Sequence, residues 1–136
     1  MRYLAIDHGK KRTGLAICDR NETICSPLTV ISAQHNVLNK IVEVIADEGV
    51  EGVVLGLPLN MDASEGPQAK IVRAFAEELA VLIDIPINFQ DERLSSFAAE
   101  DKLAPAELTR KKSKKHLDAV AAAQILENFL ENKPQK

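Results

Sequence analysis

The sequence contains little cysteine, few aromatic residues and no long apolar run. Its two cysteines, Cys18 and Cys25, form no CxxC pair, which excludes a disulfide-rich scaffold and disfavours a cysteine-based zinc or redox site. We therefore expect both thiols to be buried or half-buried. Aromatic residues make up 4% of the chain, without any tryptophan, so a surface that binds single strands by stacking on bases is not expected.

The apolar segments are too short for a membrane protein. None approaches the roughly 18 consecutive residues that a membrane-spanning helix requires, and Asp7 interrupts the first apolar run too early for a secretion signal. The composition is otherwise that of a globular chain, with 46% hydrophobic and 27% charged residues. No repeat or linker divides it, so we expect a cytoplasmic protein with one domain over residues 1–136 and no membrane contact.

Short apolar runs and helical repeats alternate along the chain. Strands are expected at Tyr3–Asp7, Thr13–Cys18, Leu28–Ile31, Gly52–Leu57 and Ile85–Gln90. Helices are expected at Val37–Asp47, with Gly49 as the stop, and at Gln68–Leu82, Ser95–Leu103 and Leu117–Leu130, while Pro105–Ser113 is a weak basic helix or a loop. Three antiparallel strands, then parallel βαβ units and a final helix, predict an α/β fold of RNase H-like architecture. Its five-stranded mixed sheet would carry helices on both faces.

Acidic residues fall where distant segments should meet at one edge of this sheet. Asp7 ends the first strand, and Asp91 and Glu92 follow the last, at the carboxyl edge where ligands gather in such folds. Because side chains alternate along a strand, only one of Asp91 and Glu92 can lie on the same side as Asp7, and the periodicity does not choose between them. Asp118 shares the sheet-packing face of the final helix with Ile125.

Each of these acids alone has an ordinary structural explanation. Asp7 could be a solvated strand end, and Asp118 a first-turn acid that the helix dipole favours. Together, however, converging carboxylates would repel one another unless cations lay among them, and Mg²⁺ and Mn²⁺ both prefer oxygen ligands. Two such ions about 4 Å apart can activate water and stabilise the leaving oxygen of a phosphodiester. The acids therefore predict two-metal phosphodiester hydrolysis.

The net charge is −3, yet the positive charge is concentrated in two places. Eight of the 17 basic residues are Lys10, Lys11, Arg12, Arg110, Lys111, Lys112, Lys114 and Lys115. A lysine run alone is usually a solvated segment. Here one run follows Asp7 and the other precedes Asp118, so we expect them to hold a phosphate backbone beside the acids.

Four separated stretches carry the most distinctive residue patterns. They are Leu4–Ala16, Gly56–Asp62 with Ser64 and Gly66, Asp91–Ser96, and Lys114–Ala122. In this order, over almost the whole chain, they resemble the YqgF/RuvX family of bacterial Holliday junction resolvases and pre-16S rRNA nucleases, within the RuvC/RNase H-like superfamily. Two positions depart from the family pattern: Ala63 stands where glycine is common, and His8 where a small or apolar residue is usual.

The resemblance implies an RNase H-like fold and a divalent-metal-dependent nuclease, which is a hydrolase acting on ester bonds. It implies that Asp7, Glu92 and Asp118 are the catalytic, metal-binding acids, and it selects Glu92 over Asp91. It also implies a substrate loop containing Asn60 and Asp62. The expected activity is endonucleolytic processing of the 5′ end of pre-16S rRNA in ribosome biogenesis, with Mg²⁺ or Mn²⁺ as cofactor.

Other functions remain open at this point. The substrate could be branched DNA cut by a Holliday junction resolvase, or the chain could be a non-catalytic nucleic-acid-binding module, although it keeps all three acids. An actin-like or sugar-kinase ATPase is suggested by Asp7-His8-Gly9. It is disfavoured because those enzymes clamp ATP between two lobes, whereas this chain has room for one and has no second phosphate loop. The sequence leaves open whether the protein is a monomer or a homodimer.

Overall fold

The computed structural model describes residues 1–34, 36–92 and 110–133, and it describes residues 110–117 through their backbone only. The helix expected at Ser95–Leu103 lies outside the described residues. Within them, no helix is both long and apolar enough to span a bilayer. Cys18 is buried and Cys25 is half-buried, and neither forms a disulfide, as the sequence predicted.

Five strands form one mixed sheet, as predicted. They are β1 (Tyr3–His8), β2 (Arg12–Cys18), β3 (Cys25–Ser32), β4 (Gly52–Leu57) and β5 (Ile87–Asp91). Their order is β3-β2-β1-β4-β5. The β1–β2 and β2–β3 pairs are antiparallel, whereas β1–β4 and β4–β5 are parallel. The carboxyl ends of β1, β4 and β5 therefore meet at one edge of the sheet.

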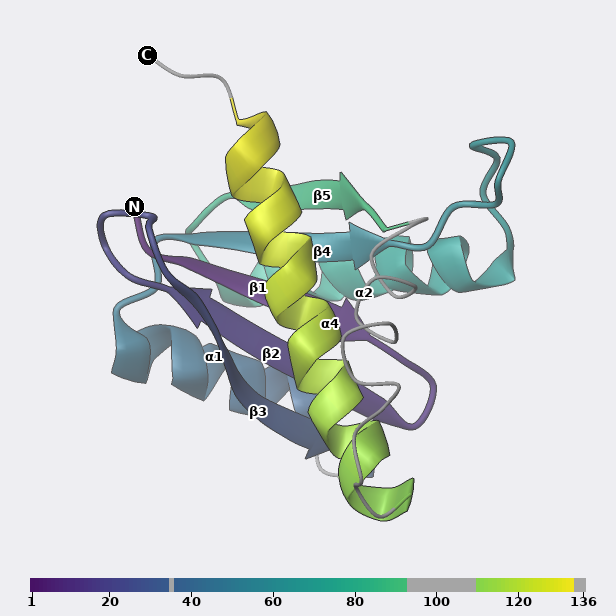
Figure 1. The fold of residues 1–136 in the computed structure, drawn as a ribbon, viewed down its shortest axis with the longest axis horizontal. Helices are drawn as coiled ribbons and strands as arrows, with labels where there is room; N and C mark the ends of the chain where they lie inside the picture. The colour runs from purple at the N-terminus through teal and green to yellow at the C-terminus, as the bar shows by residue number, and fades with distance from the viewer. Residues whose placement is uncertain (35, 93–109, 134–136) are drawn as a thin grey trace.

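Helices cover both faces of this sheet. Helix α4 (Arg110–Asn132) crosses one face, and α1 (Val37–Glu48) and α2 (Pro67–Leu82) lie behind the other (Figure 1). Helix α1 ends where expected, because Gly49 adopts φ 65° and donates its backbone N–H to the carbonyl of Ile45. This left-handed conformation favours glycine, which has no Cβ.

Alternation along the strands divides the buried residues into two cores. Leu4, Ile6 and Leu55 pack on the α1/α2 face, with Ile41 of α1 and Leu79 of α2. On the α4 face the cluster is Tyr3, Ala5, Ala16, Cys18, Val54, Ala122, Ala123, Ile125 and Leu126. Because the strand positions on this face are mostly small residues, α4 lies close to the sheet.

The boundaries of most elements differ from the prediction by one or two residues, and the two largest differences occur where the residues give no apolar pattern. Helix α4 begins at Arg110 rather than at Leu117. Its first residues are basic and so lack a hydrophobic stripe, although lysine and arginine are good helix formers. Strand β3 begins at Cys25 rather than at Leu28, and most of it is exposed at the sheet edge, where alternation is weak.

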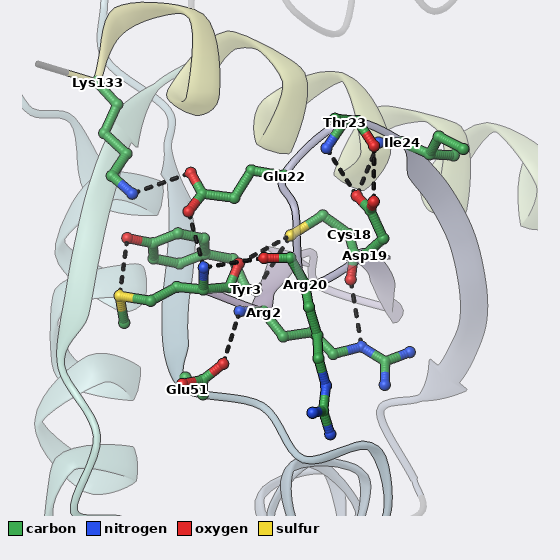
Figure 2. Close-up of polar contacts among 11 residues, drawn as sticks. Arg2, Tyr3, Cys18, Asp19, Arg20, Glu22, Thr23, Ile24, Glu51 and Lys133 are labelled. Atoms are coloured by element: carbon green, nitrogen blue, oxygen red, sulfur yellow. Dashed lines mark hydrogen bonds and ion pairs between the residues drawn. The ribbon is translucent and has the colours of Figure 1, made fainter. Parts of the chain in front are cut away.

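Ion pairs fasten α4 to the sheet near both of its ends. At one end, Lys133 Nζ lies 3.0 Å from one oxygen of the Glu22 carboxylate, and the N-terminal amine lies 2.8 Å from the other (Figure 2). Toward the other end, Arg12 Nε lies 2.7 Å from Asp118 Oδ2. These contacts join the helix to the β2–β3 turn and to the start of β2, and they add to the apolar packing of α4 on the sheet.

Helix α4 lies very close to the sheet at Gly14. This glycine lies opposite Asp7 in the β1–β2 pairing. A Cβ at Gly14 would overlap the backbone carbonyl of Asp118 and lie 3.1 Å from the backbone nitrogen of Ala119. Glycine is therefore needed at this position to let the Asp118 segment of α4 lie against β2, the strand that pairs with the strand carrying Asp7.

Adding one methyl group at Gly14 should destabilise the protein. We expect Gly14→Ala to lower the free energy of unfolding by about 3 kcal/mol, because the helix backbone must move to relieve the overlap. Gly66→Ala is the control, since its Cβ would meet first the flexible side chain of Asn60, at 3.3 Å. Urea unfolding followed by circular dichroism measures both losses. Equal losses in the two variants would contradict a backbone contact at Gly14.

Candidate active site

An open cleft of about 490 Å³ lies at the carboxyl edge of the sheet. Its lining comes from the end of β1, the β1–β2 turn, the start of α2, the residue after β5, and α4. The lining residues are Asp7, His8, Gly9, Lys10, Lys11, Arg12, Gln68, Glu92 and Asp118. The structure therefore brings together the three acids that the sequence pattern and the family resemblance selected.

Asp7 lies on the face of the sheet that α4 covers. Its strand neighbour Ala5 belongs to the α4-side core, whereas Ile6 belongs to the opposite core. Burial, together with the nearby negative charge of Asp118, raises the pKa of Asp7 to about 6. Asp7 and Asp118 are thus close enough to repel each other.

The structure places Glu92, not Asp91, on the same face as Asp7. Asp91 pairs with Leu57, which belongs to the core under α1 and α2. A Cβ on Gly56 would lie 2.5 Å from Glu92 Oε2 and 2.5 Å from Cδ1 of Ile125, which is on α4. The bare backbone of Gly56 therefore provides the space in which the Glu92 carboxylate lies.

Glu92 occupies an environment that is unfavourable for an isolated charge. Burial, and to a smaller extent the negative charges of Asp7 and Asp91, raise its pKa to about 8. Its Oε2 atom is buried, and within the part of the chain that the structure describes it has no hydrogen-bond partner. A buried carboxylate oxygen without a donor requires a proton or a cation.

The side chain of Asp118 forms an ion pair with Arg12. The two side chains are 31% and 29% exposed, and the ion pair joins α4 to β2. Arg12 was expected to contact a phosphate backbone. In this structure it lines the cleft and neutralises one of the acids.

The donor set suits a hard divalent cation, but the side chains do not already surround one. Among the described residues, no three Asp, Glu, His or Cys side chains converge closely enough to ligate a single ion as they stand. The negative charge of Asp118 disfavours the ionised form of Asp7, and Asp118 pairs with Arg12. The oxygen donors and the unpartnered Glu92 Oε2 fit Mg²⁺ or Mn²⁺, and Asp118 joins them if its side chain leaves Arg12.

The expected basic residues divide into two groups. Lys10, Lys11 and Arg12 line the cleft from the β1–β2 turn. The second run, Arg110, Lys111, Lys112, Lys114 and Lys115, lies on the first turns of α4, on the N-terminal side of Asp118. This basic run therefore lies on the part of α4 that leads to Asp118 in the cleft. Its contact with a phosphate backbone remains a prediction.

The loop containing Asn60 and Asp62 is not among the segments that line the cleft. Asn60 Nδ2 donates to Ser64 Oγ at 3.0 Å, and the backbone N–H of Ser64 donates to Asp62 Oδ1 at 2.9 Å. The Ser64 hydroxyl also donates to Asp62 Oδ1. Both expected substrate-loop residues therefore shape their own loop between β4 and α2, and a direct substrate role for them remains a prediction.

Sequence reasoning missed two kinds of residue at the site. Gly14 and Gly56 make room for Asp118 and Glu92, and the only sequence signal was a glycine inside each strand pattern. Gln68 enters the cleft from the first turn of α2, where a polar residue is unremarkable. His8 points away from Asp7, as expected, and stacks on Phe75 with ring centroids 4.0 Å apart.

Residues 1–132 match the family described as RuvX: Holliday junction resolvase. Similar proteins carry the name "Putative pre-16S rRNA nuclease". The one from Ruegeria sp. (strain TM1040) is 42% identical over 130 residues, which cover 94% of this chain and 83% of that protein. The one from Paracoccus denitrificans (strain Pd 1222) is 45% identical over 131 residues, which cover 93% and 81%.

Solved structures share the fold at low sequence identity. Thermus thermophilus RuvC in complex with a Holliday junction substrate has a TM-score of 0.57 at 15% identity, covering 96% of this chain and 95% of that one. The fowlpox virus Holliday junction resolvase has a TM-score of 0.59 at 13% identity, covering 98% and 100%. These likenesses confirm the RNase H-like fold predicted from the sequence.

The raised pKa values predict how the stability of the metal-free protein depends on pH. Both acids have higher pKa values in the folded state than the ordinary 3.8 of Asp and 4.5 of Glu. Their favourable contribution is therefore complete below about pH 4 and is lost as the pH rises through about 6 for Asp7 and about 8 for Glu92. Between pH 5 and pH 9 the free energy of unfolding should fall by on the order of a few kcal/mol.

Chemical denaturation in EDTA across this pH range measures the effect. Glu92→Gln should lose much less stability over the same interval, because a neutral amide replaces the group that ionises. Asp91→Asn is the matched control at the neighbouring position and should keep most of the wild-type pH dependence. A wild-type stability that stays level or rises from pH 5 to pH 9 would contradict the burial of these charges.

Proposed function

The chain belongs to the RuvX Holliday junction resolvase family, as its motifs predicted, and we propose that its cleft hydrolyses phosphodiester bonds with divalent cations. The observation that carries this proposal is the meeting of Asp7, Glu92 and Asp118 in one cleft that Lys10 and Lys11 also line. A cleft with acidic side chains alone would repel a nucleic acid. A cleft with basic side chains alone would bind a nucleic acid without cutting it.

The residues have separate tasks in the proposed reaction. Asp7, near the end of β1, and Glu92, directly after β5, would provide two oxygen ligands, and Asp118 would provide a third if its side chain turned from Arg12. A pair of divalent cations held by these residues would supply the Lewis acidity for activating water and stabilising the leaving oxygen. Arg12, once released by Asp118, is placed to pair with a phosphate of the substrate.

The proposed physiological substrate is the precursor of 16S rRNA, cut at its 5′ end in the cytoplasm. Relatives more than 40% identical to this chain carry that substrate in their names. Branched DNA is the second candidate, because the RuvX family is described as a Holliday junction resolvase and RuvC was solved with a junction. Both substrates present closely spaced phosphates to the same cleft.

Neutral substitutions at the three acids should abolish cleavage. We expect Asp7→Asn, Glu92→Gln and Asp118→Asn each to lower the rate by at least about 100-fold, since even groups that only orient metal ligands are worth about 10- to 100-fold. Asp91→Asn, on the other face of the sheet, is the control and should retain activity. The assay uses an end-labelled 16S precursor fragment with Mg²⁺ or Mn²⁺, beside a four-way DNA junction.

The two substrates separate the candidate functions. Faster cutting of the RNA supports the precursor assignment, and faster cutting of the junction supports the resolvase. Metal-dependent cutting that is equal in wild type and Asp7→Asn would contradict the proposed site. Salt-sensitive binding without any cutting of either substrate would identify a non-catalytic binding module.

The basic turn should contribute electrostatically to binding. Replacing both Lys10 and Lys11 by alanine should reduce the slope of log affinity against log salt by about 1 to 2, because each lysine that neutralises a phosphate releases counterions. Lys133→Ala is the control, since Lys133 lies at the far end of α4 and pairs with Glu22. RNA affinity measured in EDTA at several salt concentrations gives the slopes. Equal slopes for the double variant and wild type would remove this turn from the interface.

A further inference from the structure

Two buried side-chain oxygens have no hydrogen-bond partner within the described ranges, and both belong to residues that line the cleft. They are Oε2 of Glu92 and Oε1 of Gln68. These two oxygens therefore do not form a hydrogen bond with each other. Buried polar atoms are paired in the great majority of cases, so these oxygens call for a partner that the described residues do not provide.

The orientation of the Gln68 amide follows from its hydrogen bond to His8. Gln68 Nε2 donates to the backbone carbonyl of His8 at 3.2 Å. A carbonyl oxygen can only accept, so the NH₂ end of the amide must face His8, and Oε1 must face away from it. The side chain is thus anchored to the residue that follows Asp7, with its oxygen left for another group.

The acids of the cleft do not satisfy this oxygen. Ionised carboxylates only accept hydrogen bonds, so Asp7 and Glu92 in their charged forms cannot donate to Gln68. A cation, or water held by a cation, can satisfy an amide oxygen and two carboxylates at once. Amide and carboxylate oxygens are both ordinary ligands of hard divalent ions.

We propose that Gln68 Oε1 is a further oxygen ligand of the divalent cation in this cleft, bound directly or through one of its waters. The inference rests on the proposed function. Helix α2 lies on the opposite face of the sheet from α4, so Gln68 approaches the sheet edge from the side away from Asp118. A neutral ligand also adds a bond without adding to the repulsion among the acids.

Mn²⁺ binding, measured from the electron paramagnetic resonance signal of the free ion, tests the inference without an activity assay. We expect Gln68→Met to weaken Mn²⁺ binding by about 10-fold. Gln68→Glu also loses the donor to His8 but keeps an oxygen, so it should bind Mn²⁺ more tightly than Gln68→Met. Asn88→Leu is the control and should bind as wild type does, because Asn88 likewise donates its amide to a backbone carbonyl, that of Val53 at 3.2 Å, but does not line the cleft.

The outcomes separate this inference from the proposed function. If wild type binds no Mn²⁺, or if Asp7→Asn binds it equally well, the metal site itself is wrong. If wild type binds Mn²⁺ in an Asp7-dependent way and Gln68→Met binds it within twofold of wild type, the role of Gln68 alone is overturned. Loss of RNA affinity in EDTA by Gln68→Met, with Mn²⁺ binding intact, would assign the oxygen to the nucleic acid and also overturn the inference.

Discussion

Repulsion between buried carboxylates at the sheet edge is the constraint on which the site depends. Asp7 and Glu92 both lie in surroundings that raise their pKa values, and each is further raised by a neighbouring negative charge. Folding therefore holds these groups together at a cost in stability that a bound cation can offset. Arg12 provides a partial remedy within the protein by pairing with Asp118.

The fold assembles this site by bringing α4 close to the strands. Gly14 lets the backbone of Asp118 approach β2, and Gly56 leaves space for the Glu92 carboxylate beside Ile125. Glu22 fixes the far end of the same helix through Lys133. Substitutions that act on packing at either glycine thus change the positions of the acids without altering an acid itself.

The sequence predicted the architecture well because its signals were local. Short apolar runs located all five strands, and the apolar stripes located the helices that pack on them. The start of α4 was missed because its basic first turns carry no apolar stripe. Alternation alone did not decide between Asp91 and Glu92, since the choice depends on how β5 pairs with Leu57 of β4. The family resemblance selected Glu92, the residue that the structure places on the side of Asp7.

Other parts of the site could not be predicted from local patterns. The Arg12–Asp118 pair joins residues 106 positions apart, and the anchoring of Gln68 on His8 joins residues 60 positions apart. Such contacts arise only when helices settle on the sheet. As a result of the first contact, Arg12, which was expected to bind phosphate, pairs with Asp118, which was expected to bind metal.

A crystal structure of the protein with Mn²⁺, with the ion located by its anomalous scattering, would show whether these acids bind a cation. We expect density in the cleft at bonding distance, about 2.1 Å, from carboxylate oxygens of Asp7 and Glu92, with Asp118 turned from Arg12 toward the ion. Well-occupied Mn²⁺ sites elsewhere on the molecule, with none between these acids and the Arg12–Asp118 pair intact, would contradict it.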